Sequence, residues 1–234
     1  IFKQSEYIQA CQNTLFWTLT NVIVQVVLAV LIALALNRKI KGRGFFRTTA
    51  LIPWAVPSVI AALTFRFLYD ANVGIINAVL KKLGILADGI SWLGNLETAR
   101  WAVVIESIWK GTPFVMIFVL AALQSVPHEM YESARVDGAG RVKTFFKITL
   151  PMIKETLGIA TILTTIGTIN NFNAVWLMTQ GGPLGSTEIM FTYAYRRAFS
   201  AHNFGQAAAI SVIMFIIIAL CTFVYTKLIG EEED

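Results

Sequence analysis

The stretch TLFWTLTNVIVQVVLAVLIALALN, residues 14–37, contains no Asp, Glu, Lys, Arg or His. An α-helix needs about 20 apolar residues to cross the roughly 30 Å hydrocarbon core of a bilayer, so this stretch is long enough to span it. Three other stretches are equally free of charge: residues 48–65, 156–187 and 203–226. The sequence therefore predicts an all-α protein that crosses the membrane several times.

The composition of the whole chain supports a membrane location. Of the 234 residues, 56% are hydrophobic and only 14% are charged, whereas a soluble domain has about 25% charged residues. A fifth apolar stretch, residues 101–123, fits either a span with a functional charged pair or a buried helix of a soluble protein, and we take it as a span. The prediction is a polytopic helical bundle with five spans in this chain.

The fifth apolar stretch carries two charged side chains, Glu106 and Lys110. They are four residues apart with the acid first, the order in which they can neutralise each other on a helix. Ionisable groups inside a span are functional candidates; alternatively, Lys110 snorkels to the outer interface, as we also expect for Arg66. Four aromatic residues near span ends fit an interfacial belt: Trp17, Tyr69, Trp92 and Trp101.

The distribution of basic residues predicts the orientation of the chain. Ten of the nineteen basic residues fall in two alternate loops, residues 38–47 and 124–154, and short cytoplasmic loops are enriched in Lys and Arg. This predicts an extracytoplasmic lead-in at residues 1–13, a transmembrane domain at 14–229 that includes the cytoplasmic loop 124–154, and a cytoplasmic tail at 230–234. The net charge of +5 then reflects topology, and we expect no nucleic-acid partner.

Prolines interrupt two of the predicted spans. The second span contains Pro53 and Pro57, and the third contains Gly111 and Pro113 near its outer half. Proline removes a helical hydrogen bond, and membrane helices tolerate this where neighbours or a water-lined cavity satisfy the backbone. We therefore expect kinks in both spans and a central pathway.

The sequence offers no catalytic constellation. It contains no Gly-x-x-x-x-Gly-Lys-Ser/Thr phosphate loop, so we expect that this chain does not hydrolyse ATP by itself. The histidines, His128 and His202, are predicted on opposite sides of the membrane, and Cys11 and Cys221 have no metal-binding or redox spacing. We expect no catalytic residue, no metal and no cofactor.

The loop at residues 124–154 has the pattern of a helical hairpin. Pro127 suits a helix start, residues 128–136 read as a helix, and Gly138 and Gly140 end it. A second short helix over residues 141–149 places apolar side chains at helical spacing on one face. Such a hairpin needs a partner surface or the membrane interface to cover it, and its acids Glu129, Glu132 and Asp137 argue against anionic lipid.

The same loop carries a spaced pattern: Glu132-Ser133-Ala134, then Gly138, then Ile148-Thr149-Leu150-Pro151. This pattern resembles the cytoplasmic signature of the sugar-type permease subunits of ATP-binding-cassette (ABC) importers, especially the maltose-like ones. Ser133 stands where that family usually has alanine. The resemblance extends from about residue 7 to residue 228 and includes four more segments, residues 41–47, 109–114, 170–172 and 181–183.

The resemblance implies a role for the loop and a set of partners. In that family the loop forms coupling helices that dock into a cleft of the ATP-binding subunit, which implies docking residues Glu132, Ser133, Ala134, Asp137, Gly138 and Ala139. The implied partners are two cytoplasmic ATP-binding subunits, a second homologous permease and an extracytoplasmic solute-binding protein. The resemblance also implies the prokaryotic cytoplasmic membrane and a sixth span before residue 14. The first residue, Ile1, is not Met, and we expect the true N-terminus to lie upstream.

A polar stripe follows the fourth span, where Thr161, Thr164, Thr168 and Asn171 share one helical face. From the spacing alone, this stripe fits either a solute-facing surface or hydrogen bonds between membrane helices. The resemblance favours the solute, because maltose-like permeases hold sugar with this span and with the region of residues 109–114. It implies the substrate-binding candidates Gly111, Phe114, Thr164, Thr168 and Asn171.

Two other functions stay open from the sequence. The first is an importer of the same architecture for glycerol phosphate or another polyol derivative, although Lys110 is the one cation we expect at the pathway. The second is a channel or secondary carrier that works without ATPase partners. We find no internal repeat of the kind that builds many secondary transporters.

Overall fold

The computed structural model describes residues 2, 4–38 and 41–230, and all regular structure within them is helical. Residues 231–234 of the predicted tail lie outside the described residues. The elements, in chain order, are α1 (Ser5–Asn37), α2 (Arg43–Ala55), α3 (Ser58–Leu68), α4 (Ile75–Lys82), α5 (Leu96–Ser125), α6 (His128–Val136), α7 (Arg141–Thr144), the π-helical turn η1 (Phe145–Thr149), α8 (Leu150–Ile169), α9 (Phe172–Thr179), α10 (Met190–Tyr195), the π-helical turn η2 (Arg196–Ser200) and α11 (Phe204–Gly230). The predicted all-α class is confirmed.

The predicted number of spans agrees with the structure. In the described part of the chain, four helical runs are long and apolar enough to cross a membrane, and the bent pair α2 and α3 makes up to five. The run of α7, η1, α8 and α9 ends at Thr179, although the uncharged stretch of the sequence continues to residue 187. Glycine and proline at residues 181–183 end the helix, so residues 180–189 form a loop although residues 180–187 carry no charge.

The two predicted kinks have different outcomes. α2 ends at Ala55, α3 begins at Ser58, and the two helices meet at 91°. α5, in contrast, continues through Gly111 and Pro113 without interruption. A single proline costs one backbone bond, whereas two prolines four residues apart leave the second span without two donors.

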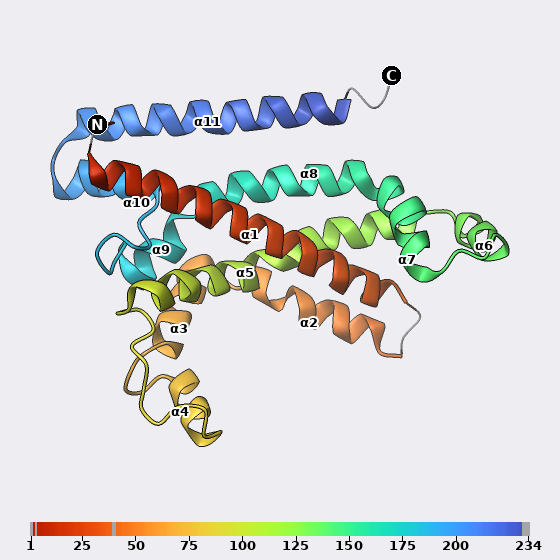
Figure 1. The fold of residues 1–234 in the computed structure, drawn as a ribbon, viewed down its shortest axis with the longest axis horizontal. Helices are drawn as coiled ribbons and strands as arrows, with labels where there is room; N and C mark the ends of the chain where they lie inside the picture. The colour runs from red at the N-terminus through yellow and green to blue at the C-terminus, as the bar shows by residue number, and fades with distance from the viewer. Residues whose placement is uncertain (1, 3, 39–40, 231–234) are drawn as a thin grey trace.

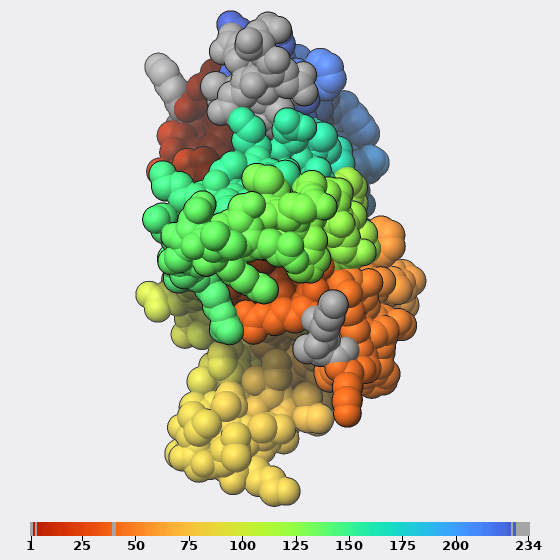
Figure 2. Space-filling view, turned by 90° about the vertical axis from the view of Figure 1, so that its right-hand side faces the viewer, coloured from red at the N-terminus to blue at the C-terminus, as the bar shows by residue number. Residues whose placement is uncertain are grey.

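Figure 1 shows α1, α5 and α8 side by side along the long axis of the bundle, with α2 beside them and α11 on the outside. The hairpin of α6 and α7 lies at one end, which we call the hairpin end. At the opposite end α3 and α4 turn sideways, and Figure 2 shows this lobe, in yellow, projecting away from the rest of the molecule.

Small side chains allow α1 and α5 to approach closely. Ala29 and Ala33 of α1 are completely buried and belong to one cluster with Val115 and Val119 of α5. Between membrane helices, where lipid is as apolar as leucine, such close van der Waals contact is a main source of association. This contact fixes α1 against α5 and so positions the polar residues described next.

Candidate functional site

The hairpin of α6 and α7 presents apolar side chains at the hairpin end. α6 begins directly after Pro127, and Gly138 takes φ +69°, a left-handed conformation that favours glycine. Val136 is 88% exposed, and Val142 and Phe146 are also exposed. The predicted helix, glycine turn and helix are therefore present, although the second helix runs through η1 directly into α8.

The implied docking residues divide between the surface and the interior of the hairpin. Glu132, Ser133, Asp137 and Gly138 are exposed, and the Glu132 carboxylate lies 3.9 Å from Nδ1 of His128. Ala134 is only 4% exposed. Its small side chain faces inward, so the surface that the hairpin offers consists of the other residues.

A row of polar side chains runs along α1 inside the bundle, and the sequence analysis missed it. The Nδ2 of Asn21 donates to the Trp17 carbonyl at 2.9 Å, and the Nε2 of Gln25 donates to the Asn21 Oδ1 at 3.3 Å and to the Ser107 carbonyl at 3.2 Å. Asn13, Trp17, Asn21 and Gln25 lie at four-residue intervals, a spacing that places them on one helical face. That spacing is the signal in the sequence from which this row of side chains could have been predicted.

Two of the implied substrate-binding residues lie close to this row of polar side chains on α1. A Cβ added to Gly111 would lie 2.4 Å from Oε1 of Gln25, so Gly111 faces α1 at close contact. The Nδ2 of Asn171 lies 3.4 Å from the Ser107 Oγ, and its Oδ1 accepts from the Ala174 backbone N–H at 3.4 Å. Asn171 thus links α5 to the break between α8 and α9.

The threonines of the fourth span differ in their hydrogen bonding. Thr161 and Thr165 donate to carbonyls four residues earlier, the local bond that serine and threonine often form in helices. Thr164 is buried and its Oγ1 has no hydrogen-bond partner. Thr168 is also buried, and its carbonyl accepts from the indole N–H of Trp17 at 2.9 Å. Trp17 is therefore an interior residue, and its assignment to an interfacial belt was wrong.

Phe114 lies further toward the hairpin end on α5. Its ring centroid is 6.5 Å from that of Trp54 and 5.0 Å from that of Phe118. Phe114 is half-buried and Trp54 is exposed in the isolated chain. The structure thus brings Gly111 and Asn171 to the same part of α5 and places Phe114 beside the broken second span.

The two charged side chains of α5 have different surroundings. Glu106 is 1% exposed, so it lies inside the bundle and not at an interface. The ion pairs found among the described residues do not include Glu106 with Lys110. Lys110 donates instead to the Val56 carbonyl at the break between α2 and α3, and Arg66 donates to the Leu177 carbonyl at 3.2 Å.

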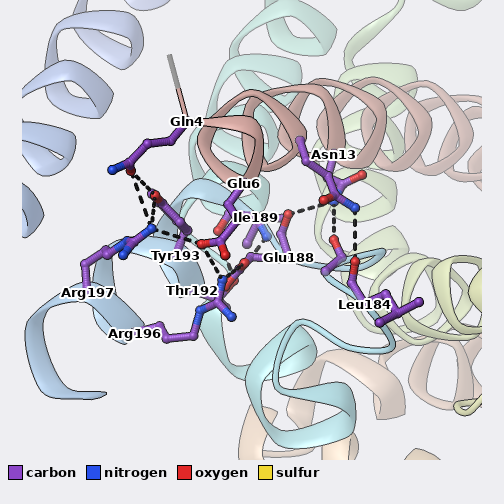
Figure 3. A network of polar contacts seen from close by, with 12 residues as sticks. Gln4, Glu6, Asn13, Leu184, Glu188, Ile189, Thr192, Tyr193, Arg196 and Arg197 are labelled. Atoms are coloured by element: carbon purple, nitrogen blue, oxygen red, sulfur yellow. Dashed lines mark hydrogen bonds and ion pairs between the residues drawn. The ribbon is translucent and has the colours of Figure 1, made fainter. Parts of the chain in front are cut away.

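At the end opposite the hairpin, side chains of α1 and α5 hold the loop at residues 180–189 (Figure 3). The Nδ2 of Asn13 donates to the carbonyls of Gly185 and Glu188 at 2.8 and 3.0 Å. The guanidinium of Arg100 donates to Asn13 Oδ1 and to the Ser186 carbonyl. The loop is therefore fixed, and it presents Leu184, which is 85% exposed.

Two arginines of η2 connect this loop to the start of α1 (Figure 3). Arg196 forms ion pairs with Glu188 and Glu6, and Arg197 pairs with Glu6 at 2.9 Å. Glu6 and Arg196 line, with Glu188 and the loop, a cavity of ≈ 420 Å³. The network ties the N-terminal turn of α1 to the α10 region.

Glu188 lies outside the spans and predicts a pH dependence of stability. Burial raises the pKa of its carboxyl from 4.5 to about 7, and the Arg196 guanidinium opposes this rise. A raised folded-state pKa means that the stability Glu188 contributes is fully present below pH 4.5 and is lost as the pH rises through about 7. The thermal midpoint of the purified protein should therefore fall from about pH 5 to about pH 8, and fall less in Glu188→Gln. Glu97→Gln, which removes an exposed carboxyl outside this network, is the control; equal falls in wild type and Glu188→Gln would contradict the prediction.

Comparisons with known proteins agree with this architecture. Residues 25–230 match the family described as "Binding-protein-dependent transport system inner membrane component". The trehalose/maltose transport system permease protein MalF of Thermococcus litoralis is 37% identical over 221 residues, which cover 94% of this chain and 74% of that protein. The sulfoquinovosyl glycerol transport system permease protein SmoG of Agrobacterium fabrum is 34% identical over 233 residues, covering 100% of this chain and 75% of that protein.

The fold is also that of a solved transporter. One chain of a bacterial ABC transporter involved in the import of the acidic polysaccharide alginate matches with a TM-score of 0.83 and 23% identity, covering 98% of this chain and 81% of that chain. The chain is a multi-pass membrane permease of an ABC transporter, and not an enzyme. It belongs to the family of binding-protein-dependent transport system inner membrane components. The resemblance to sugar-type permeases, based on the loop signature, is confirmed.

Proposed function

We propose that this chain forms half of the translocation pathway of an ATP-driven importer for a sugar or oligosaccharide of the maltose or trehalose type. The observation that carries the proposal is the hairpin of α6 and α7, which stands between two spans and exposes Val136, Val142 and Phe146. Exposed apolar side chains beside a polar rim are typical of protein contact sites. Relatives that share the permease fold include one for trehalose and maltose.

In this proposal the hairpin docks into a cleft of a cytoplasmic ATP-binding subunit. Glu132, Ser133, Asp137, Gly138 and Ala139 belong to the docking surface, and the buried Ala134 lets the hairpin pack closely on itself. The hairpin end and the C-terminus then face the cytoplasm, as the basic loops predict. Because the hairpin continues through η1 into α8, a displacement of the hairpin would move a span directly.

The sugar contacts α5 and the region where α8 gives way to α9. Asn171 and Thr164 supply neutral hydrogen-bonding groups, Phe114 supplies an aromatic surface, and Gly111 and Thr168 bring the surrounding helices together. Neutral donors and acceptors suit the hydroxyl groups of a sugar, since an unpaired hydroxyl is costly in an apolar site. The exposed face of α5 would be completed by a second, homologous permease.

The remaining partners follow from the same proposal. Two ATP-binding subunits occupy the cytoplasmic side of a prokaryotic inner membrane, and an extracytoplasmic solute-binding protein delivers the sugar. Its docking surface on this chain includes the fixed loop at residues 180–189 with the exposed Leu184. A permease for a polyol derivative is the second candidate, because a relative transports sulfoquinovosyl glycerol.

Uptake by the importer, reconstituted with its partner subunits, tests the substrate assignment. Wild type should take up maltose or trehalose in an ATP-dependent manner, and Thr164→Val should raise the KM for uptake. A sugar that loses one neutral hydrogen bond binds about fivefold more weakly, and the Thr164 Oγ1 has no hydrogen-bond partner among the described residues. Valine keeps the size of threonine, so folding should be preserved.

Thr165→Val is the matched control, because the Thr165 hydroxyl already donates to the Thr161 carbonyl. It should leave the KM unchanged. An unchanged KM in Thr164→Val would remove this residue from the binding site. ATP-independent uptake by wild type would favour a channel or carrier and contradict the proposed function.

A further inference from the structure

The break between α2 and α3 leaves backbone groups without their helical partners. Pro57 has no N–H to donate to the Pro53 carbonyl, and Val56 is extended at φ −68° and ψ 129°. In a continuous helix the Val56 carbonyl would accept from the N–H four residues later, but the 91° bend removes that donor. An unpaired carbonyl at membrane depth is costly, because hydrocarbon offers no replacement donor.

Lys110 supplies the missing donor from a different helix. Its Nζ donates to the Val56 carbonyl, although the two residues are 54 positions apart in the chain. The last turn of α2 contains no basic residue, and the C-terminal end of a helix carries a partial negative charge that a cation stabilises. Lys110, a residue of α5, therefore caps the C-terminal end of α2, because α2 has no basic residue of its own there.

The far side of the break is held in the same way. Asn173 of α9 donates through Nδ2 to the Oγ of Ser58, the first residue of α3, at 2.8 Å. The break is thus fixed by one side chain from α5 and one from α9. Trp54, which lies just before the break, is held against Phe114 on the same side of α5 as Lys110.

We propose that Lys110 is a positioning residue that fixes the broken span at its 91° bend by capping α2, without contacting the transported solute. The cap sets the place of Trp54 relative to Phe114 and to the solute-contacting part of α5. Its transport consequence rests on the proposed function, whereas the geometry of the bend does not. A residue in this role should affect every solute equally.

Spin labels on the two arms of the bend measure the cap directly. Cysteines at positions 45 and 67, in the assembled importer with Cys11 and Cys221 replaced by serine, would be about 23 Å apart at a right angle and about 33 Å apart in a straight helix. Both positions hold exposed phenylalanines. Wild type and Lys110→Arg should give one narrow short distance, and Lys110→Met a broader distribution that extends to longer distances.

Arg66→Met is the matched control, since it removes a cation-to-carbonyl bond from the same broken span but away from the break. It should keep the short distance. A narrow short distance in Lys110→Met would overturn the cap. If wild type transports no sugar, the proposed function fails. The distance measurement still shows whether Lys110 holds the bend.

Transport separates positioning from solute binding. Lys110→Met should lower the maximal rate about tenfold for every transported solute with little change in KM, and Lys110→Arg should restore most of it. A raised KM for one solute, with maximal rates kept, would overturn the proposal and make Lys110 a solute ligand.

Discussion

Gly138→Asp should reduce solute-stimulated ATP hydrolysis by the assembled importer tenfold or more, while the permease remains inserted and folded. Gly138 lies at the turn of the hairpin with φ +69°, and a Cβ added there meets no atom of the described residues within 4 Å. Aspartate tolerates the left-handed conformation better than most residues. The substitution therefore leaves the fold intact and places a charged side chain only in the contact with the ATP-binding subunit.

A second glycine of this chain provides a close control. Gly84 has φ +71°, and an added Cβ also meets nothing within 4 Å. It closely follows α4, which Figure 1 shows at the end opposite the hairpin. Gly84→Asp should leave stimulated ATP hydrolysis unchanged, so any backbone strain from the substitution is accounted for.

The measurement is ATP hydrolysis in proteoliposomes with and without the sugar-loaded binding protein, together with the amount of ATP-binding subunit that co-purifies. Loss of both in Gly138→Asp would support docking through the hairpin. Normal stimulation in Gly138→Asp would contradict it, and equal losses in Gly84→Asp would show that the effect is not specific to the hairpin.

Gly111→Val should lower the thermal midpoint of the purified importer by about 5 °C or more and strongly reduce uptake. The added side chain would overlap the amide of Gln25, which is 2% exposed and bonded to Asn21 and to the Ser107 carbonyl. Displacing this amide leaves buried polar groups unpaired, at a cost of about 1–3 kcal/mol. The close contact of α1 with α5 is then lost at the level of the candidate site.

A compensating variant tests the cause. Gln25→Ala removes the amide that valine would overlap, so the double variant Gln25→Ala with Gly111→Val should be more stable than Gly111→Val alone. Gly167→Val is the control for a helical glycine with nothing within 4 Å of its added Cβ; its midpoint should change little. An unchanged midpoint in Gly111→Val with a raised KM would show that Gly111 contacts the sugar and not Gln25.

Local features of the sequence predicted the spans, their number and the hairpin. An uncharged apolar stretch of about 20 residues is long enough to cross the hydrocarbon core of a bilayer. A glycine that ends a helix acts within a few residues of its own position. α6 accordingly has the predicted bounds, His128–Val136. The uncharged stretch at residues 156–187 extends beyond the end of α9 at Thr179, because the absence of charge measures transfer into lipid and does not measure helix formation.

Partners distant in the chain were beyond the reach of the sequence. Trp17 had the position of a belt residue, but it donates to the Thr168 carbonyl, 151 residues away. Glu106 and Lys110 had the spacing of an ion pair, but Lys110 caps α2 and Glu106 lies inside the bundle. Each side chain had several acceptable local environments, and the packing of α1, α2 and α5 selected one.

The sequence by itself determined that this protein spans a membrane several times and carries a helical hairpin between two spans, because hydrophobic length and glycine turns are local properties of the chain. Only the tertiary structure decided the 91° angle at which α2 meets α3, the contact of Gly111 with Gln25 and the residues that meet at Ser107. Inside a bilayer, every buried polar group must find a donor or acceptor within the protein. Which group it finds depends on how the helices pack, and spacing along one helix does not contain that information.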